Sequence, residues 1–326
     1  MHRTLTTTIA QLLLVLSCSL CFGAAFAEEI SVSYPSFTPS YMDHLVAIDK
    51  GYMRQEGLNV EMVKAGGGTA TQALLAGQLH FSSSAGSALS AGVRGGAVKI
   101  VYTNLSRVTY RLVSNKPEIK TLQDLIGKKI AINSFGDTGH LATLLLLKQY
   151  RIDPKAVLFV AVRSEARFPA FVSGSVDVAP LTPRDIGQVG PLKGHVLADM
   201  TKEVQMVWNG VAVADKFLVE NPLLVERFLR AVAKGREFAR RYKEPTIAIV
   251  AKYNSSAPDA LAQDYDAALA SMTPEGSVPD EVLKAEVAAR AEMTKVAKPP
   301  DAATLFDYSL IKQIYAELKR GWKPTP

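Results

Sequence analysis

Four loops rich in glycine and hydroxyl side chains follow segments that are predicted to be strands. These loops are 35–39, 66–69, 82–86 and 133–139. The last three open helices, whose free N–H groups and dipole attract an anion, and glycine lets the backbone come close to a ligand. Any one loop could simply cap its own helix. Four such loops at equivalent strand ends favour a site for a small polar or anionic ligand.

Two arginines and two phenylalanines indicate which kind of ligand the site could bind. Arg167 and Arg184 lie near predicted strand ends, where a guanidinium can hold a carboxylate or sulfonate in bidentate fashion, although either could also be a surface residue. Phe37 and Phe135 could sandwich an aromatic ring or could equally be wall packing. Asp137 is interpreted as a helix N-terminal acid. The prediction is a small organic anion, with an aromatic body as one option.

Catalytic and metal-binding patterns are missing. The sequence has no Gly-x-Ser-x-Gly nucleophile motif, no Walker A loop and no Gly-x-Gly-x-x-Gly fingerprint. Four histidines share no metal-ligand spacing: His44, His80, His140 and His195. Both cysteines, Cys18 and Cys21, precede the predicted mature chain. We therefore expect a binding protein with neither a metal nor a cofactor, and not an enzyme.

The first 27 residues read as a secretory signal. Arg3 precedes a short apolar run at 9–20, and Ala25-Phe26-Ala27 offers small residues for cleavage before Glu28. The run is too short to span a membrane, and no later stretch is long and apolar enough. A lipid anchor at Cys18 is the alternative, but the preceding residues match a lipidation box poorly. The expected location is periplasmic.

Length and charge fit a soluble globular protein. The 326 residues suggest about two domains, and 48% of them are hydrophobic. Lys and Arg number 37 against 31 Asp and Glu, a formal charge of +6. This mild excess, without basic clusters between aromatic residues, argues against a nucleic-acid partner.

Hydrophobic periodicity predicts alternating strands and helices, which favours parallel sheets. The predicted strands are 30–34, 58–63, 79–81, 98–102, 110–113, 129–132, 156–160 and 176–178. Beyond about residue 213 the pattern becomes helical, over 222–242, 258–270, 280–296 and 307–320. Segments 73–81 and 170–178 align without gaps, each as a helix end, a glycine and a short strand. The repeat suggests two similarly built lobes, although such junctions are also common by chance.

Longer stretches resemble a known family. LVAIDKGYMRQEG from Leu45, LNVEMVKAGGGTATQALLAGQLHFSSS from Leu58, IKTLQDLIGKKIAI from Ile119 and GSVDVAPLTPRD from Gly174 are similar to periplasmic solute-binding proteins of ABC importers. The branch is the one that contains nitrate, sulfonate, taurine and thiamine-precursor binders.

The resemblance implies an α/β, two-lobe type II periplasmic binding fold with the ligand cleft between the lobes. Lobe 1 would comprise 28–112 plus 212–326 and lobe 2 would comprise 113–211, with hinges near Val113 and Val211. The implied ligand contacts are Phe37, Gly68, Thr69, Ser84, Ser134, Gly136, Thr138, Arg167 and Thr182, to which the loops add Ser83, Phe135 and Arg184 as candidates.

The implied function is capture of a small molecule by closure of the lobes and delivery to a membrane permease, by a protein expected to be a monomer. Two binding alternatives stay open: a sensor that presents its ligand to a membrane receptor, and a binder of the thiamine-precursor pyrimidine. An enzyme on this fold is the least favoured reading, because the pyrimidine synthases of the family use a cysteine-rich motif that the mature chain lacks.

Overall fold

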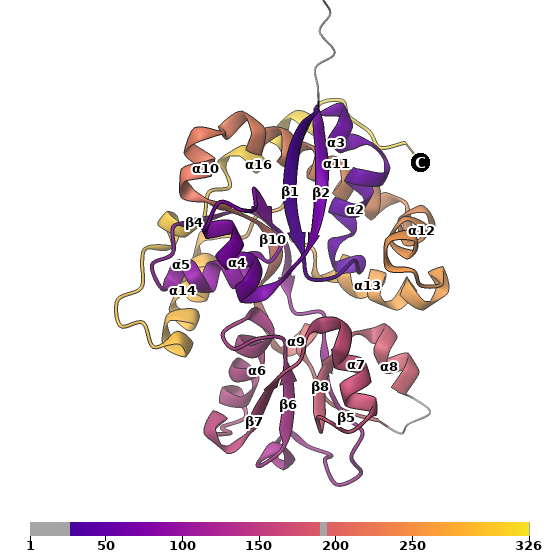
Figure 1. Cartoon of the computed structure of the whole chain (residues 1–326), viewed down its shortest axis with the longest axis vertical. Helices are drawn as coiled ribbons and strands as arrows, with labels where there is room; N and C mark the ends of the chain where they lie inside the picture. Colours follow the sequence, from indigo (N-terminus) through magenta and orange to yellow (C-terminus); the bar gives the residue numbers. More distant parts are fainter. Residues whose placement is uncertain (1–26, 190–193, 326) are drawn as a thin grey trace, which may run out of the picture.

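Two five-stranded sheets, each covered by helices, form two lobes in a computed structural model that describes residues 27–189 and 194–325 (Figure 1). The N-terminal strands and the C-terminal helices, indigo and orange to yellow in the figure, build the first lobe, and the magenta middle of the chain builds the second. The expected signal segment, with both cysteines, lies outside the described residues. No helix in the described part is long and apolar enough to cross a membrane.

The first sheet has the strand order β2-β1-β3-β10-β4. Its strands are β1 Glu28–Tyr34, β2 Leu58–Lys64, β3 Phe81–Ser82, β4 Val98–Arg107 and β10 Gln205–Ala214. β1 runs parallel to β2 and β3, whereas β10 runs antiparallel to both of its neighbours.

The second sheet repeats this plan in the order β7-β6-β8-β5-β9. Its strands are β5 Arg111–Ser114, β6 Lys129–Ile132, β7 Leu158–Ala161, β8 Val178–Leu181 and β9 His195–Asp199. β6 is parallel to β7 and β8, and β5 is antiparallel to β8 and β9.

The expectation of parallel sheets is therefore wrong for the strands that link the lobes. β4 of the first sheet and β5 of the second are joined by residues 108–110 alone, so the chain passes directly from one lobe to the other. A chain that enters a sheet from the other lobe starts at the cleft end and runs away from it. β5 and β10 therefore oppose the strands that point toward the cleft, and both sheets are mixed.

The internal repeat is confirmed in the backbone. Gly77 and Gly174 both adopt left-handed conformations, with φ of 72° and 75°. Each glycine donates its N–H to the carbonyl of the residue three positions earlier, Leu74 and Phe171 respectively. The strands that follow, β3 and β8, hold the third place in their sheets. The two lobes thus share a helix–glycine–strand unit in the same position.

Helices pack against the sheets of both lobes. In the first lobe they are α2 Met42–Asp49, α3 Tyr52–Gln55, α4 Gly67–Leu75, α5 Ala85–Val93, α10 Asp215–Glu220, α11 Pro222–Arg241, α12 Lys243–Asn254, α13 Ala262–Ser271, α14 Asp280–Thr294, α15 Ala302–Leu305 and α16 Ser309–Leu318. In the second they are α6 Thr138–Gln149, α7 Ser164–Val172, α8 Pro183–Val189 and α9 Met200–Glu203.

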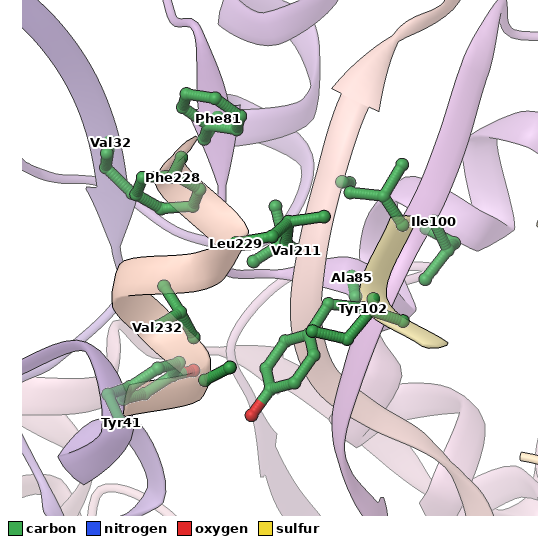
Figure 2. Close-up of a cluster of buried hydrophobic side chains, with 14 of the residues drawn as sticks. Val32, Tyr41, Phe81, Ala85, Ile100, Tyr102, Val211, Phe228, Leu229 and Val232 are labelled. Atoms are coloured by element: carbon green, nitrogen blue, oxygen red, sulfur yellow. The ribbon is translucent and has the colours of Figure 1, made fainter. Parts of the chain in front are cut away.

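The long helix α11 anchors the core of the first lobe. Its buried stripe includes Phe228, Leu229 and Val232. The ring of Phe228 stacks on Phe81 of β3, with centroids 4.0 Å apart, beside Val32 of β1 (Figure 2). The predicted amphipathic helix after residue 222 therefore joins the C-terminal part of the chain to the first sheet.

Strand pairing also shows where the chain crosses from one lobe to the other. Residues 108–110 connect β4 to β5, and the chain returns to the first sheet at Gln205, which pairs with Arg107. Residues 205–211, expected in the second lobe, thus pair with β4 of the first. The difference arises because β10 shows no alternation that would mark it as a strand: its residues are buried almost continuously.

Candidate ligand-binding site

A small cavity lies where the two lobes face each other. It has a volume of about 60 Å³, and both lobes and the connecting segments supply its walls. Because one water needs roughly 10–15 Å³ of such space, this central cavity holds about four to six waters or a compact ligand group. Its lining is Pro35, Tyr41, Gly67, Ser84, Ser87, Tyr110, Ile132, Asn133, Asp137, Thr138, Gly139, Ser164, Arg167, Pro180 and Trp208.

Arg167 is the cation of the central cavity. It lies in α7 and is 7% exposed. Its Nη1 donates to the carbonyl of Pro180 at 3.2 Å, and its guanidinium carbon sits 5.0 Å from the centre of the Tyr110 ring. Its Nε has no hydrogen-bond partner, and in the described part of the chain no carboxylate comes within 4.0 Å of the guanidinium. A buried arginine with a free donor and no ion pair is ready to take an anion.

Starts of three helices surround the same cavity. Gly67 opens α4 with φ of 58°, a left-handed conformation that favours glycine. Ser84 directly precedes α5 and Thr138 opens α6, and these side chains are 7% and 6% exposed. The hydroxyl of Ser84 has no partner. Hydroxyl donors and helix N-termini both favour a negative ligand.

The second charged residue of this cavity serves its own helix. Asp137 caps α6: its Oδ1 accepts the His140 N–H at 2.7 Å, and its Oδ2 accepts the Ser134 N–H at 3.1 Å. Burial raises the pKa of the Asp137 carboxyl. Its interpretation as a helix N-terminal acid is confirmed.

Two wider chambers flank the central cavity. One, of about 280 Å³, is lined by Thr69 and Ser134 among others. The other, of about 290 Å³, is lined by Phe37, Thr182, Arg184 and again Arg167. The structure thus brings Ser84, Thr138 and Arg167 together around the central cavity. The predicted contacts that line the two outer chambers are Phe37, Thr69, Ser134, Thr182 and Arg184.

Four predicted contact residues line none of these cavities. Ser83 is fully buried, Gly68 is exposed with open space beside it, and Gly136 lies next to Arg94. Phe135 is 67% exposed and packs edge-on against His140. Because Phe37 instead packs against Tyr34 and Tyr253, the suggested aromatic sandwich finds no support.

Arg184 joins the two lobes. Its backbone N–H donates to Asp264 Oδ1 at 2.7 Å, and its Nη1 reaches Asn254 Oδ1 at 3.3 Å and Ser256 Oγ at 3.1 Å. Its Nη2 contacts Asp185 Oδ1 at 3.3 Å. Three of these contacts lie across the lobe boundary, so both Nη atoms have protein partners without a ligand, whereas the Nε of Arg184 has none.

Sequence reasoning missed the aromatic floor of the cleft. Tyr41, Tyr110 and Trp208 line the central cavity, and the last two rings meet edge to face at 5.0 Å. Tyr110 lies in the 108–110 connection between the lobes and Trp208 lies in β10, and neither residue opens a helix. Among residues 27–189 and 194–325, no group of three or more His, Cys, Asp or Glu could hold a metal ion.

Solved structures share this fold at low identity. A protein of Bordetella bronchiseptica RB50 superposes with a TM-score of 0.77 at 18% identity, over 89% of this chain and 98% of that one. The periplasmic aliphatic sulphonate binding protein SsuA of Escherichia coli gives 0.68 at 19%, over 88% and 99%. The desulfurization enzyme DSZB gives 0.62 at 13%, over 89% and 99%.

The periplasmic binding protein fold expected from the sequence is thereby confirmed. No curated protein sequence matches the chain significantly. The sequence does match the NMT1/THI5-like family over residues 38–246, well over half of its length, and the chain belongs to that family.

Proposed function

We propose that this protein is the periplasmic substrate-binding component of an ABC importer and that it binds a small organic anion, a sulfonate or carboxylate, between its lobes. The observation that carries the proposal is Arg167, a buried guanidinium with an unpartnered Nε and no carboxylate within 4.0 Å in the described chain. Family membership and the likeness to a sulphonate-binding periplasmic protein support the same class.

Charge and geometry explain why an anion suits the cavity. Burying a charge without a partner costs free energy. A ligand of opposite charge removes this cost, because it forms a strong hydrogen-bonded ion pair with the guanidinium. Ser84 from the first lobe and Thr138 from the second can donate to the same group. A ligand that contacts both lobes binds the closed arrangement better and shifts the population toward it.

The proposal includes a route. The chain would be exported with residues 1–27 as its signal, act as a monomer and deliver its ligand to a membrane permease. The lobes would be those expected from the sequence, 28–112 plus 212–326 and 113–211, except that 111–112 of β5 join the second lobe and 205–211 join the first. Residues 108–110 and the stretch before Gln205 would then serve as hinges.

Replacing Arg167 tests the anion site directly. Arg167→Ala should weaken binding at least tenfold, about 1.4 kcal/mol, in calorimetry with methanesulfonate, benzenesulfonate, acetate and benzoate. Arg167→Lys keeps the charge but not the planar fork and should fall in between. Arg320→Ala removes an exposed arginine of the first lobe and should change nothing. Unchanged affinity in Arg167→Ala would overturn the anion site.

The role as a carrier needs its own measurement. Native mass spectrometry of the purified protein, followed by denaturation, should release an intact organic acid in stoichiometric amount. Because a desulfurization enzyme shares this fold, the released compound should also be recovered unchanged after prolonged incubation with the protein. Chemical conversion of it would point to an enzyme instead of a carrier.

A further inference from the structure

One loop borders four cavities of the cleft. Residues 35–41 follow β1 and help to line the central cavity, the two wider chambers and a smaller cavity of about 40 Å³ that Asp264 also lines. Pro35 lines all four of them, and Pro39 opens the short 3₁₀ helix η1 Pro39–Tyr41. Because proline fixes the backbone angle φ, the loop is stiff, and the position of this wall depends on where the loop is anchored.

Ser40 provides the first anchor of loop 35–41. Its carbonyl accepts a side-chain N–H of Asn209 at 2.6 Å and one of Asn104 at 3.3 Å. Both asparagines are 1% exposed, and they lie on β10 and β4, the strands that lead into the proposed hinges. The Ser40 hydroxyl also lies 3.4 Å from that of Thr109, in the 108–110 connection. The loop is therefore attached to both hinge strands.

Phe37 provides the second anchor. Its carbonyl accepts a side-chain N–H of Asn254, the last residue of α12, at 3.0 Å. The Oδ1 of Asn254 accepts from the Arg184 guanidinium of the second lobe at 3.3 Å. One side-chain amide thus connects the loop to a contact that exists only when the lobes are together.

The other two asparagines use their amides in the same way. Asn209 Oδ1 accepts the backbone N–H of Leu105 at 3.2 Å. Asn104 Oδ1 accepts from the buried Arg236 guanidinium of α11 at 3.1 Å. In each case the amide nitrogen donates to the loop and the amide oxygen accepts from outside it. An ionised Asp has the same shape and would keep the acceptor, but it has no donor for the loop.

We infer that Asn104, Asn209 and Asn254 are positioning residues, which fix loop 35–41 to the hinge strands and to Arg184 so that the wall of the cleft moves with the lobes. Asn104 and Asn209 lie outside the walls of the four cavities that the loop lines, so they act through the loop. A binding wall keeps its geometry only when neighbouring hydrogen bonds support it. The inference rests on the proposed function, because it concerns the hinges and the cleft of that proposal.

Substituting Asp for Asn tests whether the amides hold the loop. Hydrogen exchange at the backbone amides of residues 36–42, measured without ligand, should be at least tenfold faster in Asn209→Asp and in Asn254→Asp than in the original protein. Asn221→Asp removes a similar bond, from Nδ2 to the Phe217 carbonyl at 3.3 Å before α11, and should leave this exchange unchanged. Unchanged exchange in the test variants would overturn the inference. Asn254 is only half-buried, so its variant decides the question if a buried carboxylate at position 209 prevents folding.

Calorimetry tests whether the position of the loop matters for the ligand. Both test variants should bind methanesulfonate, benzenesulfonate, acetate and benzoate at least tenfold more weakly, by a similar factor for all four, because the wall is disturbed and Arg167 is not. Asn221→Asp should bind all four as the original protein does.

Asn254→Asp separates this role from simple closure of the lobes. The new carboxylate would form an ion pair with Arg184, so a residue that only held the lobes together would give tighter binding in this variant. Equal or tighter binding would therefore overturn the inference and leave the proposed anion site intact. Failure of the original protein to bind any of the four acids would instead refute the proposed function, and hydrogen exchange would still decide whether the asparagines hold the loop.

Discussion

The buried carboxylate of Asp264 should make the protein less stable as the pH rises through about 6. Its pKa is raised from about 3.9 in an unfolded chain to about 6 in the folded protein, and burial is the main cause. Two pKa units correspond to about 3 kcal/mol. The folded state therefore holds its proton more tightly, and this contribution is complete below pH 4 and lost above pH 6.

Comparing the original protein with Asp264→Asn isolates that contribution. Asn keeps an oxygen for the Arg184 N–H but cannot ionise, so every other titrating group cancels in the difference. Relative to the variant, the original protein should lose about 3 kcal/mol between pH 4 and pH 8. At about 2 °C per kcal/mol, the difference in Tm should change by about 6 °C in the variant's favour.

Thermal unfolding at half-unit pH steps, without ligand, measures this change. The part of the Tm difference that does not change with pH reports the cost of burying an amide. Only the change of the Tm difference with pH tests the prediction. Asp266→Asn should run parallel to the original protein at every pH, because its carboxylate is exposed. A Tm difference for Asp264→Asn that stays constant from pH 4 to pH 8 would refute the reasoning.

Two further variants probe closure and the rim of the cleft. A Cβ on Gly86 would lie 2.4 Å from Thr138 Oγ1 of the other lobe and 2.5 Å from the Val207 carbonyl. Gly86→Ala should therefore weaken binding of any ligand at least tenfold and enlarge the radius of gyration in X-ray scattering, whereas Gly68→Ala, with open space around it, should do neither. Full affinity in Gly86→Ala would show that closure tolerates the extra atom. Phe135→Ala should leave anion affinity within about twofold, because the ring is 67% exposed; a tenfold loss in calorimetry would restore its suggested contact with the ligand.

Local patterns predicted most of the architecture. The repeat around Gly77 and Gly174 indicated two similar lobes because a left-handed helix end is a local property of the chain. Periodicity did not reveal β10, because nearly all of its residues are buried, which removes the alternation that identifies a half-exposed strand; only the family resemblance placed a crossover strand near Val211. Its antiparallel direction depends on how the chain returns from the other lobe, which no local pattern encodes.

The site was predictable where a residue follows a strand or opens a helix. Ser84, Thr138 and Arg167 were found in this way and do line the central cavity. Asp264 was not, because it lies on an amphipathic helix of the C-terminal region, 80 residues from the Arg184 that contacts it. Its carboxylate contacts Arg184 because α13 packs against α8 of the second lobe, and such a contact cannot be read from the spacing of residues along the chain.

Arg167 and Arg184 show why residue type alone does not define a contact with the ligand. Both line the same outer chamber. The guanidinium of Arg184 already has Asn254, Ser256 and Asp185 as partners, most of them across the lobe boundary, so it favours closure whether or not a ligand is present. The Nε of both side chains has no partner, but the guanidinium of Arg167 also has no carboxylate within 4.0 Å in the described chain, so an anionic ligand can pair with it directly. Closure would then combine a fixed contribution from Arg184 with one from Arg167 that depends on the ligand, which is how a carrier distinguishes its loaded state from its empty one.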